Sequence, residues 1–101
     1  MATFGIVYRF PRGTREQYEN LIEVVHPDGG KALPEGQLLH LAGPTSDGWL
    51  VMAVHESRQS WERFRDDTLT PGLAGVDDGP PGPPEEMTFD VQVFHTRQRT
   101  A

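Results

Sequence analysis

Two histidines in the middle of the chain have the side chain and the setting that proton-transfer chemistry needs. His40 interrupts the apolar run Leu38–Ala42, and His55 ends a second apolar run that begins at Trp49. A neutral imidazole titrates near physiological pH, so it can accept a proton from a phenol or an enol. Such a histidine can equally be a core or interface residue, because buried polar side chains usually find hydrogen-bond partners. The sequence leaves both roles open.

Four aromatic side chains are candidates for a binding wall near these histidines. Trp61 and Phe64 share the apolar face of one predicted helix, and Tyr18 lies on the apolar face of another. Trp49 begins the run that ends at His55. Aromatic residues at this spacing can line a cleft for a planar ligand, and they can also simply fill the core. The two interpretations are compatible.

The sequence lacks the residues or motifs that several other kinds of site require. The chain has no cysteine, which excludes disulfides, thiolate metal sites and cysteine nucleophiles. The four histidines show no metal-ligand spacing, so no metal is expected. No glycine-rich phosphate motif or nucleophile elbow occurs, and Ser57 is better interpreted as a helix N-cap than as a nucleophile. We therefore expect no cofactor.

Length and composition indicate one small domain over residues 1–101. Hydrophobic residues make up 36% of the chain, which is too many for a disordered protein. The formal net charge of −6 disfavours nucleic acid as a partner. No apolar run approaches the roughly 18 residues that a membrane helix needs, and the first residues do not resemble a signal peptide. We expect a cytoplasmic protein without a membrane partner.

Hydrophobic periodicity predicts the elements that must position these side chains. Thr14 and Gln17 have the spacing of a capping box, so a helix is expected over 14–26. A second helix is expected to begin after Ser57 and to end before Thr70. Strands are expected over residues 3–10, 38–42, 49–55 and 88–95, with an acidic, proline-rich loop over 75–86 and a frayed tail over 96–101.

The order strand, helix, strand, strand, helix, strand predicts a ferredoxin-like α+β fold. Both helices would cover one face of a four-stranded antiparallel sheet. Pairing Ala42 with Trp49 in the central hairpin would place Leu38, His40 and His55 on one face. Both sheet faces carry apolar side chains, and an exposed apolar face is a liability in a monomer. We therefore expect a homodimer that packs its sheets together.

The residue pattern resembles the dimeric α/β barrel proteins of the antibiotic-biosynthesis-monooxygenase-like superfamily, in particular short, uncharacterised actinobacterial members. The motifs that carry this resemblance are Gly13-x4-Tyr18, Leu33-Pro34-Glu35-Gly36-x3-His40-x2-Gly43, Asp47-Gly48-Trp49, Val54-His55-Glu56-Ser57 and Trp61-x2-Phe64. The superfamily includes cofactor-free oxygenases of aromatic polyketides, haem-degrading enzymes, lactone isomerases and cyclases. The haem-degrading members use an Asn on the first strand, whereas the only Asn here is Asn20, so haem degradation is disfavoured.

Two functional hypotheses follow. The resemblance implies a small-molecule-binding protein of secondary metabolism that acts as a cofactor-independent oxygenase, cyclase or isomerase on an aromatic or polyketide-like metabolite. In that hypothesis His40 and His55 are the acid–base candidates, and Tyr18, Trp49, Trp61 and Phe64 bind the ligand. The alternative is a non-catalytic dimeric module that binds a hydrophobic ligand or another protein. Fold analogy alone does not choose between the two.

Overall fold

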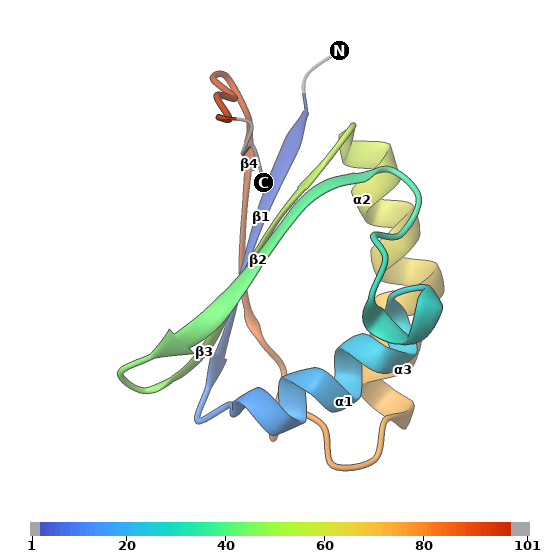
Figure 1. Ribbon diagram of the computed structural model, residues 1–101, viewed down its shortest axis with the longest axis vertical. Helices are drawn as coiled ribbons and strands as arrows, with labels where there is room; N and C mark the ends of the chain where they lie inside the picture. The colour runs from blue at the N-terminus through green and yellow to red at the C-terminus, as the bar shows by residue number, and fades with distance from the viewer. Residues whose placement is uncertain (1–2, 98–101) are drawn as a thin grey trace.

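Four antiparallel strands form one sheet, and the helices all cover the same face of it (Figure 1). The computed structural model describes residues 3–97. The strand order is β2-β3-β1-β4, which confirms the ferredoxin-like α+β fold. The elements in chain order are β1 (Phe4–Pro11), α1 (Arg15–Val25), the 3₁₀ turn η1 (Asp28–Gly30), β2 (Gln37–Thr45), β3 (Gly48–His55), α2 (Arg58–Phe64), the π turn η2 (Arg65–Leu69), α3 (Thr70–Gly75) and β4 (Glu85–Asp90).

The first helix begins where the capping box predicts. The Thr14 hydroxyl accepts the Gln17 N–H at 3.1 Å, and the Gln17 side-chain oxygen accepts the Thr14 N–H at 3.0 Å. These two bonds satisfy backbone donors that the first helical turn leaves free. At the other end His26 precedes a proline and has extended backbone angles, so the helix stops at Val25.

The second helical segment is longer than its sequence predicts. Ser57 caps α2 as expected, accepting the Ser60 N–H at 3.0 Å. The chain then stays helical through η2 and α3, although the turn-like residues from Thr70 onward predict an end. Pro71 lies in the first turn of α3, which is the part of a helix that best tolerates proline.

The last strand begins three residues earlier than predicted and ends at Asp90 rather than at residue 95. Glu85 and Glu86, expected in the loop, pair with Arg9 and Tyr8 of β1. Arg9 donates to Glu85 at 3.0 Å, and the Tyr8 hydroxyl donates to Glu86 at 2.7 Å. These partners on the central strand extend β4 into the acidic segment. Of the predicted tail, residues 98–101 lie outside the described residues.

The register of the central hairpin differs from the prediction by two residues. Ala42 lies opposite Val51 rather than Trp49, because β2 runs on to Thr45 and only two residues form the turn. A shift of two keeps every side chain on its face, so His40 and His55 still share the inner face. A bulge between Gln37 and Leu39 changes one position, since it places Gln37 opposite His55 and leaves Leu38 48% exposed.

Side chains from the inner face of the sheet and from the helices form the core. Its buried members are Phe4, Ile6, Tyr8, Phe10, Leu21, Val25, Trp49, Trp61, Phe64 and Leu69. The outer sheet face also carries large apolar side chains, and several are well exposed, namely Leu41 (55%), Met52 (37%), Met87 (65%) and Phe89 (45%). Within residues 3–97 no helix has the length and apolar character to cross a membrane.

Gly72 lets α3 pack closely against α1, and its replacement tests that packing. A Cβ at Gly72 would overlap Cγ1 of the buried Val25, whereas a Cβ at Gly75 of the same helix would meet nothing. Gly72→Ala is expected to destabilise the fold by about 1–3 kcal/mol through overpacking, despite the better helix propensity of alanine. Gly75→Ala, the matched control, is expected to be neutral or to stabilise by up to about 1 kcal/mol. Urea unfolding measures both, and equal stabilities would contradict the close contact.

Candidate functional site

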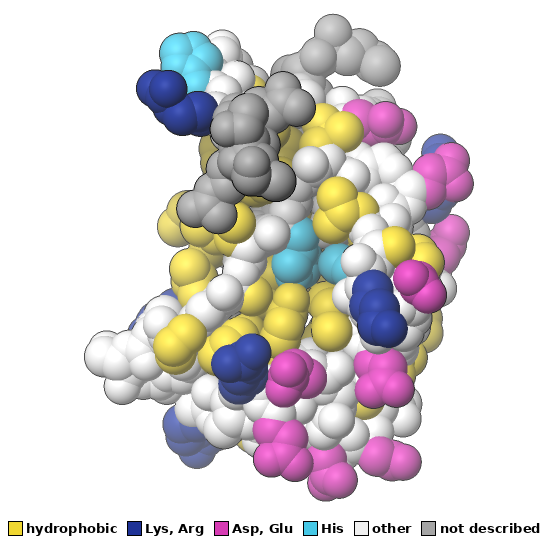
Figure 2. Space-filling view, in the orientation of Figure 1, with side chains coloured by type: hydrophobic (Ala, Val, Ile, Leu, Met, Phe, Trp, Pro, Cys, Tyr) yellow, Lys and Arg dark blue, Asp and Glu magenta, His cyan; other side chains and the backbone are white. Residues whose placement is uncertain are grey.

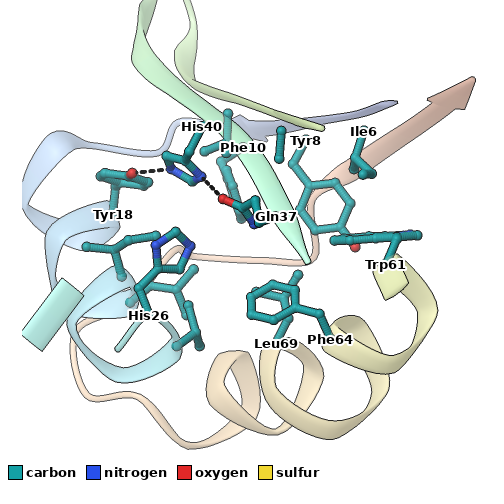
Figure 3. A pocket seen from close by; sticks show the side chains of 15 residues that line it. Ile6, Tyr8, Phe10, Tyr18, His26, Gln37, His40, Trp61, Phe64 and Leu69 are labelled. Carbon is teal, nitrogen blue, oxygen red and sulfur yellow. Dashed lines mark hydrogen bonds between the residues drawn. The ribbon is translucent and has the colours of Figure 1, made fainter. Parts of the chain in front are cut away.

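A small cavity lies between the inner face of the sheet and the helices (Figure 3). Its volume is about 50 Å³. Most of its lining is apolar, and the side chains of Tyr18, His26 and Gln37 lie around His40, which comes from β2. The lining residues are Ile6, Tyr8, Phe10, Tyr18, Leu21, Ile22, Val25, His26, Gln37, His40, Val51, Ala53, Trp61, Phe64 and Leu69.

Tyr18 and His40 form the polar contact at the cavity wall. The Tyr18 hydroxyl lies 2.6 Å from His40 Nε2, and the two rings are stacked with an interplanar angle of 25°. Burial raises the pKa of the Tyr18 phenol, with a smaller contribution from the charge of Glu19, and burial lowers the pKa of His40. Both groups are therefore neutral at pH 7, and the contact is a phenol–imidazole hydrogen bond.

Gln37 connects His40 to the second histidine. Its side-chain oxygen lies 3.0 Å from His40 Nδ1, and its side-chain nitrogen lies 3.2 Å from His55 Nε2 (Figure 3 shows the first of these bonds). The amide oxygen can only accept, so His40 carries its proton on Nδ1. His40 Nε2 is then an acceptor, and the Tyr18 hydroxyl donates to it. The bulge that turns Gln37 inward thus brings the amide to the nitrogen of His40 on which the tautomer depends.

His55 does not line the cavity. Its side chain is fully buried behind Gln37, where its ring packs against Trp61 and Phe64 with both centroids 5.6 Å away. Its Nδ1 lies 3.0 Å from the Ser60 hydroxyl. Burial lowers its pKa to about 4, so it is neutral at pH 7. The geometry gives His55 no direct reach to a ligand in the cavity, and it communicates with the cavity through Gln37.

Three of the four aromatic candidates line the cavity, and the fourth does not. Tyr18, Trp61 and Phe64 line the cavity together with His40. Trp49 lies behind Tyr18, at a centroid distance of 5.3 Å, and lines a neighbouring depression instead. Trp49 supports the tyrosine without reaching the cavity.

His26 also lines the cavity, although the sequence marked it only as the end of a helix. Its ring meets the His40 ring edge-on at a centroid distance of 4.7 Å. Burial, with a smaller contribution from the nearby His40, lowers its pKa to about 4. The helical spacing could have predicted His26 as a lining residue, since Tyr18, Ile22 and His26 lie four residues apart along one face. Gln37 had no comparable signal, because it follows a loop and turns inward at a bulge.

Two buried donors are left without a hydrogen-bond partner among the described residues, the indole N–H groups of Trp49 and Trp61. An unpaired buried donor costs about 1–3 kcal/mol. Trp61 is itself a lining residue of the cavity, so an acceptor on a ligand that reached its N–H would recover part of that cost. Within residues 3–97 no group of three potential ligand side chains is arranged to hold a metal ion.

Comparison with known proteins finds no matching family model and no similar curated protein.

The buried histidines make stability depend on pH. Folded His26 and His55 have a pKa of about 4 against an ordinary value of 6.5, so the unfolded chain binds more protons between those values. Lowering the pH from 7 to 5 is expected to cost about 2 kcal/mol of unfolding free energy for each histidine, whereas raising it above 7 adds nothing from them.

Urea unfolding of the wild type and of His26→Asn over pH 4–8 measures this contribution. The variant lacks one of the buried histidines whose pKa is lowered, so its stability should fall less steeply below pH 6.5. Identical slopes for the two proteins would show that His26 is not held neutral in the folded state.

Proposed function

We propose that this chain forms a homodimer of the antibiotic-biosynthesis-monooxygenase-like kind, which binds a small planar molecule in the cavity and moves a proton to or from it. The observation that carries this proposal is the Tyr18–His40 hydrogen bond of 2.6 Å at the wall of a largely apolar cavity. Neutral His40 offers its Nε2 lone pair there, so a phenolic or enolic hydroxyl can take the place of Tyr18 and give up its proton. An apolar setting strengthens each such polar contact.

Proton abstraction from an aromatic or polyketide-like metabolite is common to the three reactions that we consider. An isomerase or a cyclase needs only proton transfers within the substrate. A cofactor-independent oxygenase needs dioxygen as a second substrate, to which the deprotonated ligand passes an electron. His40 acts as the base in each case, Tyr18 is its hydrogen-bond partner until a ligand displaces it, and Trp61 and Phe64 form the walls.

The size of the cavity constrains how a ligand enters. An engineered cavity of about 150 Å³ is known to hold benzene, and the volume here is about 50 Å³. A ring therefore enters only if lining side chains move, and Tyr18 and Ile22 are half-buried on α1. Figure 2 shows histidine side chains in a hollow framed by hydrophobic ones on this face of the molecule, so the approach from solvent is open.

The same small volume favours the second candidate, a non-catalytic module. In that function the layer between sheet and helices is a filled core, and Tyr18, His40 and Gln37 satisfy one another's hydrogen bonds. Binding would then occur on the outer surface, to a hydrophobic ligand or another protein. A ligand titration separates the two functions.

The outer face of the sheet supports the homodimer. Leu41 and Met52 lie opposite each other in the β2–β3 pair, and Met87 pairs with Val7 across β1 and β4. Glu85 and Arg9, which are salt-bridged, stand at one end of the same face. A largely apolar sheet face of this kind is usually covered by another surface. A second copy of this chain offers an identical apolar face, which satisfies a two-fold interface.

2-Naphthol, a planar phenol whose absorption spectrum reports its ionisation, tests the ligand proposal. We expect it to quench tryptophan fluorescence in the wild type, and we expect His40→Leu to weaken its binding about tenfold, or about 1.4 kcal/mol, because the phenol loses its acceptor. Val24→Ala, a change at an exposed α1 side chain outside the cavity, is the control and should bind normally. No binding by the wild type, or equal binding by His40→Leu, would favour the non-catalytic module.

Sedimentation velocity tests the dimer. The wild type should sediment as a dimer and Leu41→Asp as a monomer, because a carboxylate buried in an apolar interface loses its hydration without gaining a partner. Val24→Asp places the same charge on an exposed apolar position of α1 and should remain dimeric. A monomeric wild type or a dimeric Leu41→Asp variant would contradict packing through the sheet.

A further inference from the structure

A continuous row of side-chain hydrogen bonds links the cavity to a second opening in the surface. It runs from Tyr18 through His40, Gln37 and His55 to Ser60, with successive distances of 2.6, 3.0, 3.2 and 3.0 Å. The Ser60 end faces a groove of about 200 Å³, lined by Pro34, Glu35, Gly36, Glu56, Ser60, Arg63, Phe64, Asp67 and Thr68. The row therefore has one end at each of two separate sites.

The loop before β2 holds the Ser60 end in place. Gly36 has a φ of +83°, and a Cβ at this position would overlap the Ser60 hydroxyl oxygen. The Gly36 carbonyl also accepts the Glu56 N–H at 2.8 Å, which ties the loop to the end of β3. Glycine is thus required directly before Gln37, both for its backbone angles and for the space that Ser60 occupies.

Donor and acceptor rules allow the row only two complete arrangements. A neutral imidazole has one donor and one acceptor nitrogen, and an amide donates only from nitrogen and accepts only at oxygen. With the Gln37 amide as it stands, His40 and His55 both carry the proton on Nδ1, and His55 donates to Ser60. In the reversed arrangement the Gln37 amide is turned over and both rings carry the proton on Nε2. A mixture leaves two donors or two acceptors facing each other, at a cost of about 1–3 kcal/mol.

We propose that Gln37 is a positioning residue that couples the tautomers of His40 and His55, so that the hydrogen bonding of Ser60 at the groove sets whether His40 Nε2 accepts or donates at the cavity. This inference rests on the proposed function, because His40 must accept in order to take a proton from a ligand. Burial keeps both rings neutral at pH 7, so the tautomer and not the charge is the property that differs between the two arrangements.

Ser60→Ala tests the coupling from the far end of the row. Without the hydroxyl, the His55 Nδ1–H has no acceptor, and an orphaned buried N–H is rarer in proteins than an under-satisfied acceptor. His55 should therefore move its proton to Nε2, the Gln37 amide should turn over, and His40 should also move its proton to Nε2. Alanine suits the helical position of Ser60, so the fold should be kept.

Long-range proton–nitrogen NMR on the full chain with labelled histidines reads the tautomers directly. We expect Nδ1 protonation of both rings in the wild type and Nε2 protonation of both in Ser60→Ala. Thr68→Ala is the matched control, since it removes another hydroxyl from the groove that takes no part in the row, and it should leave both rings unchanged. An unchanged His40 in Ser60→Ala, or any other proton distribution in the wild type, would overturn the proposal.

Variants of Gln37 show whether the amide carries the coupling. In Gln37→Leu, the additional Ser60→Ala change should no longer alter the His40 tautomer. Gln37→Glu serves if the leucine variant does not fold, because a carboxylate accepts from both rings and should hold His40 on Nδ1 and His55 on Nε2 with or without Ser60. These spectra need no ligand, so a failure of 2-naphthol to bind would refute the proposed function without touching the coupling.

Discussion

The inner layer of this protein depends on how buried polar groups satisfy one another in a largely apolar space. The imidazoles of His40 and His55, the Tyr18 phenol and the Gln37 amide lie between the sheet and the helices, where each is at least half-buried and finds a partner among the others. Gln37 is the partner of two of them at once, since it is both a donor and an acceptor. A single amide therefore contacts both rings and ties the proton positions of His40 and His55 to each other.

The backbone supplies Gln37 through a local irregularity. A β2 strand without the bulge would place Leu38 on the inner face opposite His55, and the apolar leucine side chain would offer the imidazole no hydrogen bond. The bulge between Gln37 and Leu39 turns the amide inward instead. Gly36, with its positive φ and no side chain, lets the backbone before Gln37 pass close to Ser60. Bulges commonly re-aim a side chain near a functional site. The hydrogen-bonded row and the strand irregularity are thus parts of one arrangement.

Local patterns predict much of the fold. The capping box at Thr14 and the N-cap at Ser57 depend on neighbouring residues only, and both are found where they were expected. The errors arise where distant residues decide the structure. β4 extends to Glu85 because Arg9 and Tyr8 provide partners from the central strand, and the hairpin register depends on the length of its turn. An even register error left the two histidines on their predicted face.

The candidate site was predictable in outline but not in its connections. Helical spacing brings Tyr18, Trp61 and Phe64 to the sheet, whereas the partner that joins the histidines comes from a loop and a bulge without periodicity. A crystal structure at neutral pH, inspected at Gln37, tests the account most directly. We expect the two terminal atoms of the Gln37 amide to lie about 3.0 Å from His40 Nδ1 and about 3.2 Å from His55 Nε2. A Gln37 side chain turned toward solvent, with the two histidines bonded to separate partners, would contradict it.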